Sequence, residues 1–277
     1  MSIFHAIVLG IVQGLTEFLP ISSSGHLIVV PWLFNWNDFG DAQATARAFD
    51  TALHLGTLIA VLFYLRQDLV PYVRHGLRMV VSRRTADTII GRQAWLFVLS
   101  AVPAAIVGAV AEDWITEQLG TPVLIAVSLI AFGALLIWAD KQSGARQLDS
   151  FTRRDALLIG AAQVLALNPG TSRSGITITA ARRFGFSRDA AARVSFLMSV
   201  PIIGGAVLLK LFTLAQDGIP EGFIVPMIVG IISAGISGWC AMWAMIRLLR
   251  TRSFTPFVMY RFVAGTAILA IAASAWR

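Results

Sequence analysis

The first segment with residues suited to chemistry is the turn Pro20-Ile21-Ser22-Ser23-Ser24-Gly25-His26. Its proline ends a helix, and its serines can cap the next helix, whose free N–H groups attract anions. A serine hydroxyl could act as a nucleophile, and His26 could act as an acid, a base or a nucleophile. The alternative is a structural turn with a hydrogen-bonded histidine, because serine-rich turns cap many helices.

A glutamine and a glutamate precede this turn at helical spacing. Gln13 and Glu17 are four residues apart and therefore share one face of a helix. An ionised glutamate among apolar residues normally faces a cavity or a partner, so Glu17 is a candidate acid, base or cation ligand. A position near the outer headgroups is the alternative. Asp50 and His54, also four residues apart, could add a ligand or a proton relay, or could serve only packing.

The counterpart of this turn is Asn168-Pro169-Gly170-Thr171-Ser172-Arg173-Ser174-Gly175. The planar guanidinium of Arg173 suits phosphate oxygens, and the serines beside it add hydroxyl donors. Together the two turns offer an acid, a base, a nucleophile and a positive charge, which phosphoryl transfer requires. A divalent cation could bind between Glu17 and the phosphates, mainly through substrate oxygens. A structural ion pair between Arg173 and Glu17 is the alternative, and it is compatible with an anion site in the resting protein.

The composition places these turns in a membrane protein. The 277-residue chain is 57% hydrophobic and only 13% charged, with a mean hydropathy of +0.74. Soluble domains carry about 25% charged residues, and several uncharged runs of this chain are long enough to cross a bilayer. The predicted fold class is therefore an all-α polytopic membrane protein. The net charge of +7 reflects membrane topology rather than nucleic-acid binding, and the single Cys240 excludes an intramolecular disulfide.

Basic and acidic segments alternate along the chain. Most of the 22 Lys and Arg residues lie in four segments, at 66–92, 141–154, 182–193 and 247–252. The positive-inside rule places these segments in the cytoplasm and the acidic ones outside. Six spans then fit, at about 49–65, 94–111, 121–139, 194–214, 222–246 and 256–276. Lys210 and Arg261 lie within these spans, and we expect their long side chains to reach the membrane surface.

Two further apolar stretches, 2–36 and 155–183, are each interrupted by one of the polar turns. The flanking charges predict that both are re-entrant helical hairpins, which enter the membrane from opposite faces. Five positions of the first stretch match residues 150 positions later: Gly10, Gln13, Leu15, Ser24 and Gly25. We therefore predict one integral membrane domain, 1–277, built as an inverted repeat of about 1–139 and 140–277. A chance likeness between two turns rich in glycine and serine is the alternative.

In these motifs the sequence resembles the undecaprenyl pyrophosphate phosphatase family, also called BacA after bacitracin resistance. Residues 13–17 and the turn ending at His26 look like the first family motif, and residues 169–175 look like the second. The resemblance covers essentially the whole chain. It implies an enzyme of the bacterial inner membrane that converts undecaprenyl pyrophosphate to undecaprenyl phosphate. This product is the recycled lipid carrier for peptidoglycan precursors.

The resemblance also implies roles for individual residues. Ser23 would be the nucleophile and His26 its base or a proton donor, with attack by His26 on phosphorus as the alternative. Glu17 would assist a divalent cation, Mg²⁺ or Ca²⁺, or a proton transfer, and Arg173 would hold the pyrophosphate. Substrate contacts would come from Gln13, Ser22, Ser24, Gly170, Ser172, Ser174 and Thr177. Because Gln13 is a neutral amide, it cannot act as a base and is a poorer cation ligand than glutamate.

The same resemblance implies a site that opens toward the periplasm, with membrane lipids around the protein and a homodimer as one possible assembly. The alternative function is a lipid-phosphate flippase or a secondary transporter, because inverted re-entrant hairpins are common in carriers. Release of phosphate from the lipid substrate would distinguish the enzyme from the carrier.

Overall fold

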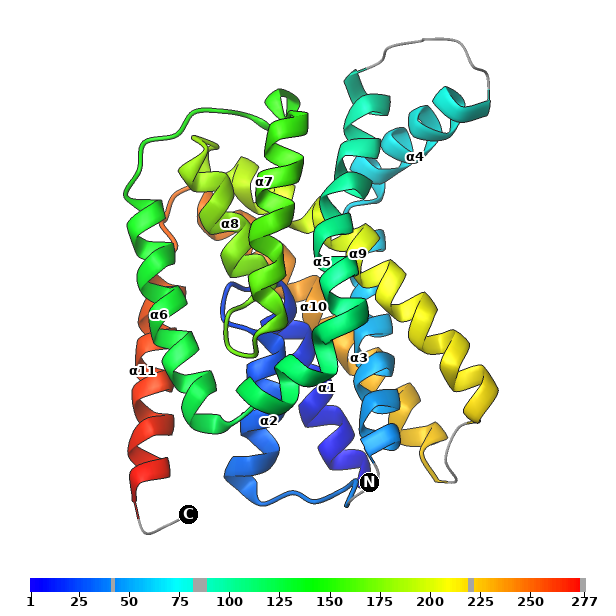
Figure 1. Ribbon diagram of the computed structural model, residues 1–277, viewed down its shortest axis with the longest axis vertical. Helices are drawn as coiled ribbons and strands as arrows, with labels where there is room; N and C mark the ends of the chain where they lie inside the picture. The colour runs from blue at the N-terminus through cyan, green and yellow to red at the C-terminus, as the bar shows by residue number, and fades with distance from the viewer. Residues whose placement is uncertain (41–42, 82–88, 219–221, 275–277) are drawn as a thin grey trace.

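The computed structural model describes residues 1–40, 43–81, 89–218 and 222–274. Most of these residues lie in helices, and the β-type pairing found among them is an isolated bridge between Arg146 and Phe186. The predicted all-α fold class is confirmed. The α-helices of the described residues, shown in Figure 1, are α1 (Ile3–Phe18), α2 (Ser23–Phe34), α3 (Gln43–Tyr64), α4 (Arg66–Val81), α5 (Ile89–Leu119), α6 (Pro122–Asp140), α7 (Arg153–Gln163), α8 (Arg173–Arg183), α9 (Arg188–Asp217), α10 (Ile224–Leu249) and α11 (Thr255–Ala273).

Five helices of the described residues are individually long and apolar enough to cross a membrane, namely α5, α6, α9, α10 and α11. Each of them coincides with a predicted span, although the last two residues of the predicted span 256–276 lie outside the described residues. The remaining predicted span, 49–65, lies in α3. By length and composition α3 counts as a candidate membrane span only together with α4, and the two helices are bent by 87° at Leu65. The protein is therefore a polytopic membrane protein with five or six apolar spans.

Helix α4 lies within the basic segment 66–92, which the sequence predicted to be cytoplasmic. The structure adds that residues 66–81 of this segment are helical. One face of this helix packs on α5, whereas Val70, Val73 and Leu77 on other faces are more than half exposed. Tyr72 packs edge-on against Phe97 of α5, with ring centroids 5.5 Å apart. One turn later, the Gly76 carbonyl accepts a hydrogen bond from the Trp95 indole at 3.1 Å. The basic segment used to predict topology thus also contains an amphipathic helix, α4.

The two predicted turns connect α1 to α2 and α7 to α8. Figure 1 shows these helix pairs approaching from opposite ends of the molecule, with their turns together near mid-height. We call residues 19–22 the first elbow and residues 168–172 the second elbow. Each elbow ends in a serine, Ser22 or Ser172, with a positive φ of 77°, and each serine caps the following helix. The two residues are 150 positions apart, so the sequence likeness extends to an unusual backbone conformation.

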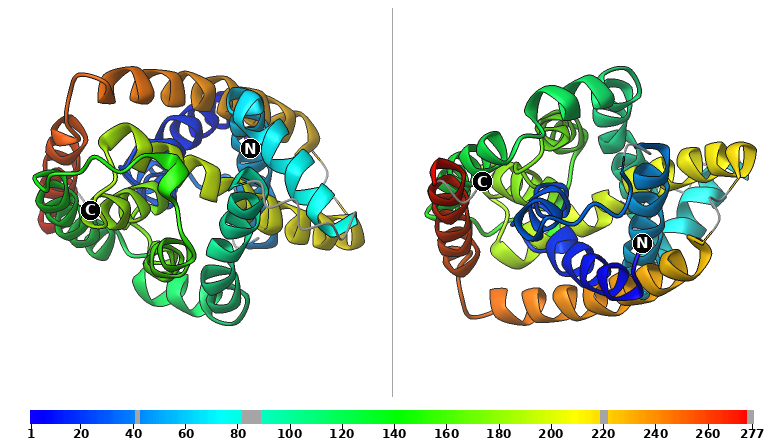
Figure 2. Two further views of the ribbon diagram at one scale, coloured as in Figure 1. Left: turned by 90° about the horizontal axis from the view of Figure 1, so that it is seen from above. Right: turned by 90° about the horizontal axis from the view of Figure 1, so that it is seen from below.

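Small residues bring the elbow-bearing helices close to their neighbours. A Cβ on Gly14 of α1 would lie 2.4 Å from the Ala234 carbonyl oxygen of α10. A Cβ on Gly160 of α7 would lie 2.5 Å from the Ser100 carbonyl oxygen of α5. Figure 2 shows α1 running alongside α10. Such close backbone contact is typical of helix pairs in membranes and fixes the direction in which each elbow points.

A polar cluster outside the predicted spans fixes the start of α7. Thr152 and Asp155 form a capping box, and Arg146 binds the Asp155 carboxylate through both terminal nitrogens, at 3.0 and 2.6 Å. Burial opposes ionisation of Asp155, but hydrogen bonds from Arg146 and Thr152 outweigh it and hold the pKa of this carboxyl below its ordinary value. The cluster therefore orients the helix that leads to the second elbow.

Candidate active site

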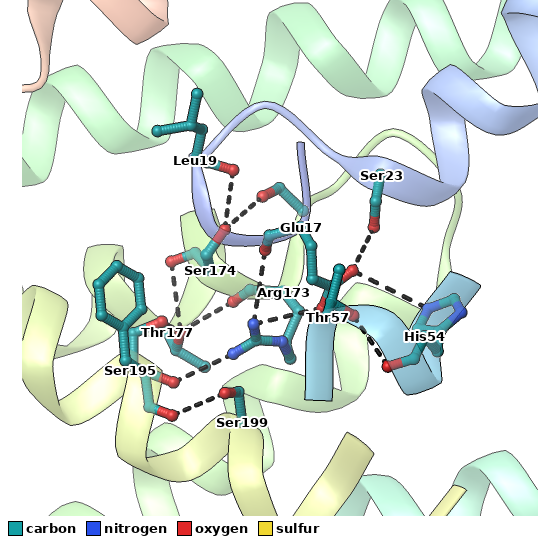
Figure 3. Close-up of polar contacts among 12 residues, drawn as sticks. Glu17, Leu19, Ser23, His54, Thr57, Arg173, Ser174, Thr177, Ser195 and Ser199 are labelled. Atoms are coloured by element: carbon teal, nitrogen blue, oxygen red, sulfur yellow. Dashed lines mark hydrogen bonds and ion pairs between the residues drawn. The ribbon is translucent and has the colours of Figure 1, made fainter. Parts of the chain in front are cut away.

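Glu17 lies at the centre of the site, in the last turn of α1, and is only 6% exposed. Its Oε2 accepts hydrogen bonds from Ser23 Oγ at 2.7 Å and from Gln13 Nε2 at 3.1 Å. Figure 3 shows the serine pointing at the carboxylate across the first elbow. The prediction that Gln13 and Glu17 share a helix face is confirmed. A carboxylate bonded to a serine hydroxyl is placed to take the proton of that hydroxyl.

Arg173 is the first residue of α8 and reaches Glu17 from the second elbow. Its Nη2 lies 3.4 Å from Glu17 Oε1, and its Nη1 donates to the Ser195 carbonyl at 3.0 Å. The Nε group is buried and has no hydrogen-bond partner among the described residues. The predicted ion pair is therefore present, but it is long and leaves donor capacity unused. A guanidinium held in this way can bind anionic oxygens.

Hydroxyl groups around the start of α8 fix the position of Arg173. Thr177 Oγ1 donates to the Arg173 carbonyl at 2.8 Å and lies 2.8 Å from Ser195 Oγ. Ser174 Oγ lies 3.1 Å from Ser172 Oγ and donates to a carbonyl of the first elbow at 3.0 Å. Three residues predicted to contact substrate thus hold the arginine in place. Ser195 belongs to α9 and was not predicted, because a serine in an apolar helix carries no distinguishing sequence signal.

The three serines of the first turn have different surroundings. Ser22 is buried, and its Oγ accepts hydrogen bonds from Gly25 N at 3.4 Å and from Gly170 N at 3.1 Å. It therefore joins the two elbows, with Gly170 as its partner. Ser24 is exposed, whereas Ser23 is half-buried and bonded to the central carboxylate. Of these hydroxyls, that of Ser23 is the one prepared for proton transfer.

His26 lies one turn after Ser23 but binds other groups. Its Nδ1 is 2.6 Å from the Ser22 carbonyl oxygen, and its Nε2 is 2.7 Å from Tyr260 Oη. Since a carbonyl only accepts, Nδ1 carries the proton and Nε2 accepts from the tyrosine hydroxyl. The hydroxyl of Ser23 is bonded to Glu17 rather than to this histidine. Tyr260 was not identified from the sequence.

His54 is the second imidazole beside the central carboxylate. Its Nε2 lies 3.9 Å from Glu17 Oε2, and its Nδ1 donates to the Asp50 carbonyl at 2.8 Å. Figure 3 shows the ring on α3 facing Glu17. The side chain of His54 is 37% exposed, whereas that of Glu17 is 5% exposed, so the imidazole is far more accessible than the carboxylate. Asp50 and His54 were both candidates for the site. The ring of His54 faces Glu17, whereas Asp50 takes part through its backbone carbonyl, which binds that ring.

Arg261 of α11 contradicts the expectation that its side chain reaches the membrane surface. The residue is 0% exposed and donates to backbone carbonyls, including Pro20 O in the first elbow and Gly170 O in the second. A charged group in the middle of an apolar helix is better solvated by nearby free carbonyls than by the bilayer interior. The charge within an apolar span was the sequence signal for this role.

Oxygen donors around Glu17 would suit a hard divalent cation. Within the described residues, no group of three or more His, Cys, Asp and Glu side chains is arranged to hold a metal ion. However, Gln13 Oε1 is buried beside Glu17 and has no hydrogen-bond partner in the described part of the chain. One carboxylate and one amide oxygen match the preference of Mg²⁺ and Ca²⁺ for oxygen ligands, with phosphate oxygens supplying further ones.

Comparisons with known proteins find relatives along nearly the whole chain. The family model "Bacitracin resistance protein BacA" matches residues 6–267. An undecaprenyl-diphosphatase of Geobacter sulfurreducens is 48% identical over 275 residues, which cover 98% of each chain. Its namesakes in Geobacter metallireducens and Hahella chejuensis are 45% and 41% identical, and each alignment covers 97% of this chain and 98% of the relative. Both segments that form the site lie within these alignments.

Proposed function

This chain belongs to the bacitracin resistance protein BacA family, and from that premise we propose how its site works. The protein is an undecaprenyl-diphosphatase: it hydrolyses undecaprenyl pyrophosphate to undecaprenyl phosphate and phosphate. This reaction recycles the lipid carrier used for cell-wall polymers and confers bacitracin resistance. The observation that carries the mechanism is the contact of Ser23 and Arg173 with the same buried carboxylate, that of Glu17.

The two helix pairs that bear the elbows form re-entrant hairpins of an inverted repeat. The shared offset of 150 positions supports this arrangement, as do the equivalent serine caps and the basic segments that flank α7 and α8. The hairpins carry the polar site toward the middle of the membrane, where broken helices of such repeats commonly bind ligands. The basic segments lie in the cytoplasm and the site opens toward the periplasm, while the prenyl chain stays in lipid.

Catalysis begins with attack of Ser23 Oγ on the terminal phosphorus. Its proton passes to Glu17 Oε2, which lies 2.7 Å away, and the bond from phosphorus to the bridging oxygen breaks. The proton then passes to the departing undecaprenyl phosphate. In the second step Glu17 takes a proton from the water that attacks the phosphoserine, and returns it to Ser23 as phosphate leaves.

Positive charge stabilises the phosphoryl group during both steps. Arg173 exchanges its long contact with Glu17 for the phosphate oxygens, with its free Nε–H as an additional donor. Glu17 and Gln13 would hold Mg²⁺ or Ca²⁺ together with the diphosphate. When bound, this cation neutralises phosphate charge that one arginine cannot balance alone.

A rapid acid and a rapid base quench with substrate labelled on the terminal phosphate test this mechanism. Phosphoserine survives acid, whereas phosphohistidine survives base. We expect acid-stable label in the wild type and none in Ser23→Ala, with phosphate release measured in parallel from farnesyl pyrophosphate and Mg²⁺. Base-stable label that disappears in His26→Ala would replace Ser23 by His26 as the nucleophile. Lipid translocation in liposomes without phosphate release would favour a carrier.

A further inference from the structure

The two elbows must stay aligned in a reaction that separates Arg173 from Glu17. In the proposed mechanism, the guanidinium leaves the carboxylate for the phosphates, so the ion pair between α1 and α8 is lost when substrate binds. Ser23 must nevertheless stay within reach of a phosphorus atom held from the second elbow. An error of about 1 Å in such an alignment can cost roughly 100-fold in rate. Contacts that do not involve substrate are needed to preserve the alignment.

Arg261 makes such contacts with both elbows. Its Nη1 donates to Pro20 O at 3.0 Å and to Thr171 O at 3.1 Å. Its Nη2 donates to Gly170 O at 2.9 Å and to Thr171 O at 3.1 Å. Pro20 and Gly170 are 150 positions apart, so the guanidinium binds equivalent carbonyls of the two elbows. One side chain thus bridges the repeat at matching positions.

The backbone that follows these carbonyls is strained. Ser22 and Ser172, two residues after Pro20 and Gly170, both have φ of 77°, which is unfavourable for a residue with a Cβ. Such conformations persist only where surrounding contacts fix them. Hydrogen bonds from Arg261 hold the carbonyls that lie close to these two strained serines. They thereby fix the elbows that precede α2 and α8.

Arg261 is itself firmly held. Its Nε donates to Leu129 O of α6 at 2.9 Å, and its Nη2 also approaches Ser128 O at 3.3 Å. The side chain is fully buried, and no ion pair of the described residues includes it. The N–H groups of its guanidinium therefore donate to backbone oxygens in one planar arrangement. A lysine ammonium cannot reproduce this arrangement. The contacts connect the elbows to α6 and α11, which also pack on each other.

We propose that Arg261 is a positioning residue for the hydrolysis, which holds the two elbows in register so that Ser23 and Glu17 face Arg173. The proposal rests on the function proposed above. Arg261 acts through the backbone of the elbows and touches neither substrate nor cation. Its loss should therefore lower the rate of the chemical step more than the affinity for substrate.

The test measures kcat and KM of purified Arg261→Gln and Arg261→Lys with farnesyl pyrophosphate and Mg²⁺. We expect kcat of the glutamine variant to fall at least about 30-fold while KM changes less than about 3-fold. The lysine variant should recover part of kcat, because it keeps the charge and some of the donors. Met259→Ala, at an exposed neighbour on α11, is the matched control and should behave like the wild type.

A second variant moves Arg261 without removing it. A Cβ on Gly265, one turn along α11, would lie 2.9 Å from Ala126 O of α6, so Gly265→Ala pushes the two helices apart. We expect the same fall in kcat at nearly constant KM, by at least about 3-fold. Normal kcat in folded Arg261→Gln or in Gly265→Ala would overturn the proposal, and so would a rise in KM at constant kcat. A wild type that releases no phosphate would instead refute the proposed function.

Discussion

Replacing Glu17 by glutamine separates proton transfer from the rest of the site. The substitution keeps the size of the side chain and one oxygen acceptor, but an amide cannot take the proton of Ser23. Loss of a general base costs about 10²–10⁴ in rate, or roughly 2.7–5.4 kcal/mol of activation free energy. We therefore expect kcat of Glu17→Gln to fall at least about 100-fold.

The same substitution removes the counter-ion of Arg173. Breaking a buried pair costs about 3–5 kcal/mol, and we expect the lower end because Arg173 keeps its bond to the Ser195 carbonyl and is 12% exposed. Substrate phosphates can replace the lost carboxylate beside Arg173, so KM measured at saturating Mg²⁺ should stay the same or fall. Pyrophosphate should also raise the melting temperature of Glu17→Gln more than that of the wild type.

Phosphate release from farnesyl pyrophosphate with Mg²⁺ gives kcat and KM, and thermal unfolding in detergent gives the stability. Glu117→Gln, which changes an exposed glutamate at the end of α5, is the matched control. A Glu17→Gln enzyme with kcat within about 3-fold of the wild type would refute the role of this carboxylate as the base. A higher KM at unchanged kcat would assign it to substrate binding instead.

Three further predictions concern Arg173, the cation and Asp155. Arg173→Lys keeps the charge but loses the planar fork, so kcat/KM measured by phosphate release should fall about 10- to 100-fold; wild-type values would contradict the clamp. EDTA should abolish activity, and Gln13→Glu, by adding a carboxylate beside Glu17, should lower the half-saturating Mg²⁺ concentration at least about 5-fold in titrations after EDTA treatment; an unchanged Mg²⁺ requirement would argue against this ligand. Because the folded-state pKa of Asp155 is depressed, its carboxylate stabilises the protein above the ordinary pKa of 3.8 and loses that effect as pH falls below it. Asp155→Asn should therefore lower the melting temperature at pH 7 by at least about 3 °C, and this difference should shrink below pH 4, whereas a constant difference would contradict the linkage.

The sequence predicted the parts of this protein that depend on local pattern. Uncharged runs located the spans, and proline, glycine and serine located both elbows, because each signal reflects a local backbone or solvation requirement. Contact between Glu17 and Arg173 followed from charge in an apolar setting. The bond between His26 and Tyr260 did not follow, because it depends on where α11 packs. The role of Arg261 was predicted wrongly for the same reason. An arginine within an apolar span looks the same in the sequence whether its side chain reaches the membrane surface or binds buried backbone carbonyls.

The relation between the elbows explains why both are needed for the reaction. Ser23 is the first residue of α2 and Arg173 is the first residue of α8, so the proposed nucleophile and the proposed phosphate clamp occupy equivalent positions 150 residues apart. The equivalent of Glu17 is Leu167, which can neither activate a nucleophile nor pair with a guanidinium. Gln163, the equivalent of Gln13, is buried, and its amide has no hydrogen-bond partner among the described residues. The two helix pairs joined by these elbows thus hold complementary chemical groups. Because neither pair has a complete set, the alignment between the pairs becomes part of catalysis.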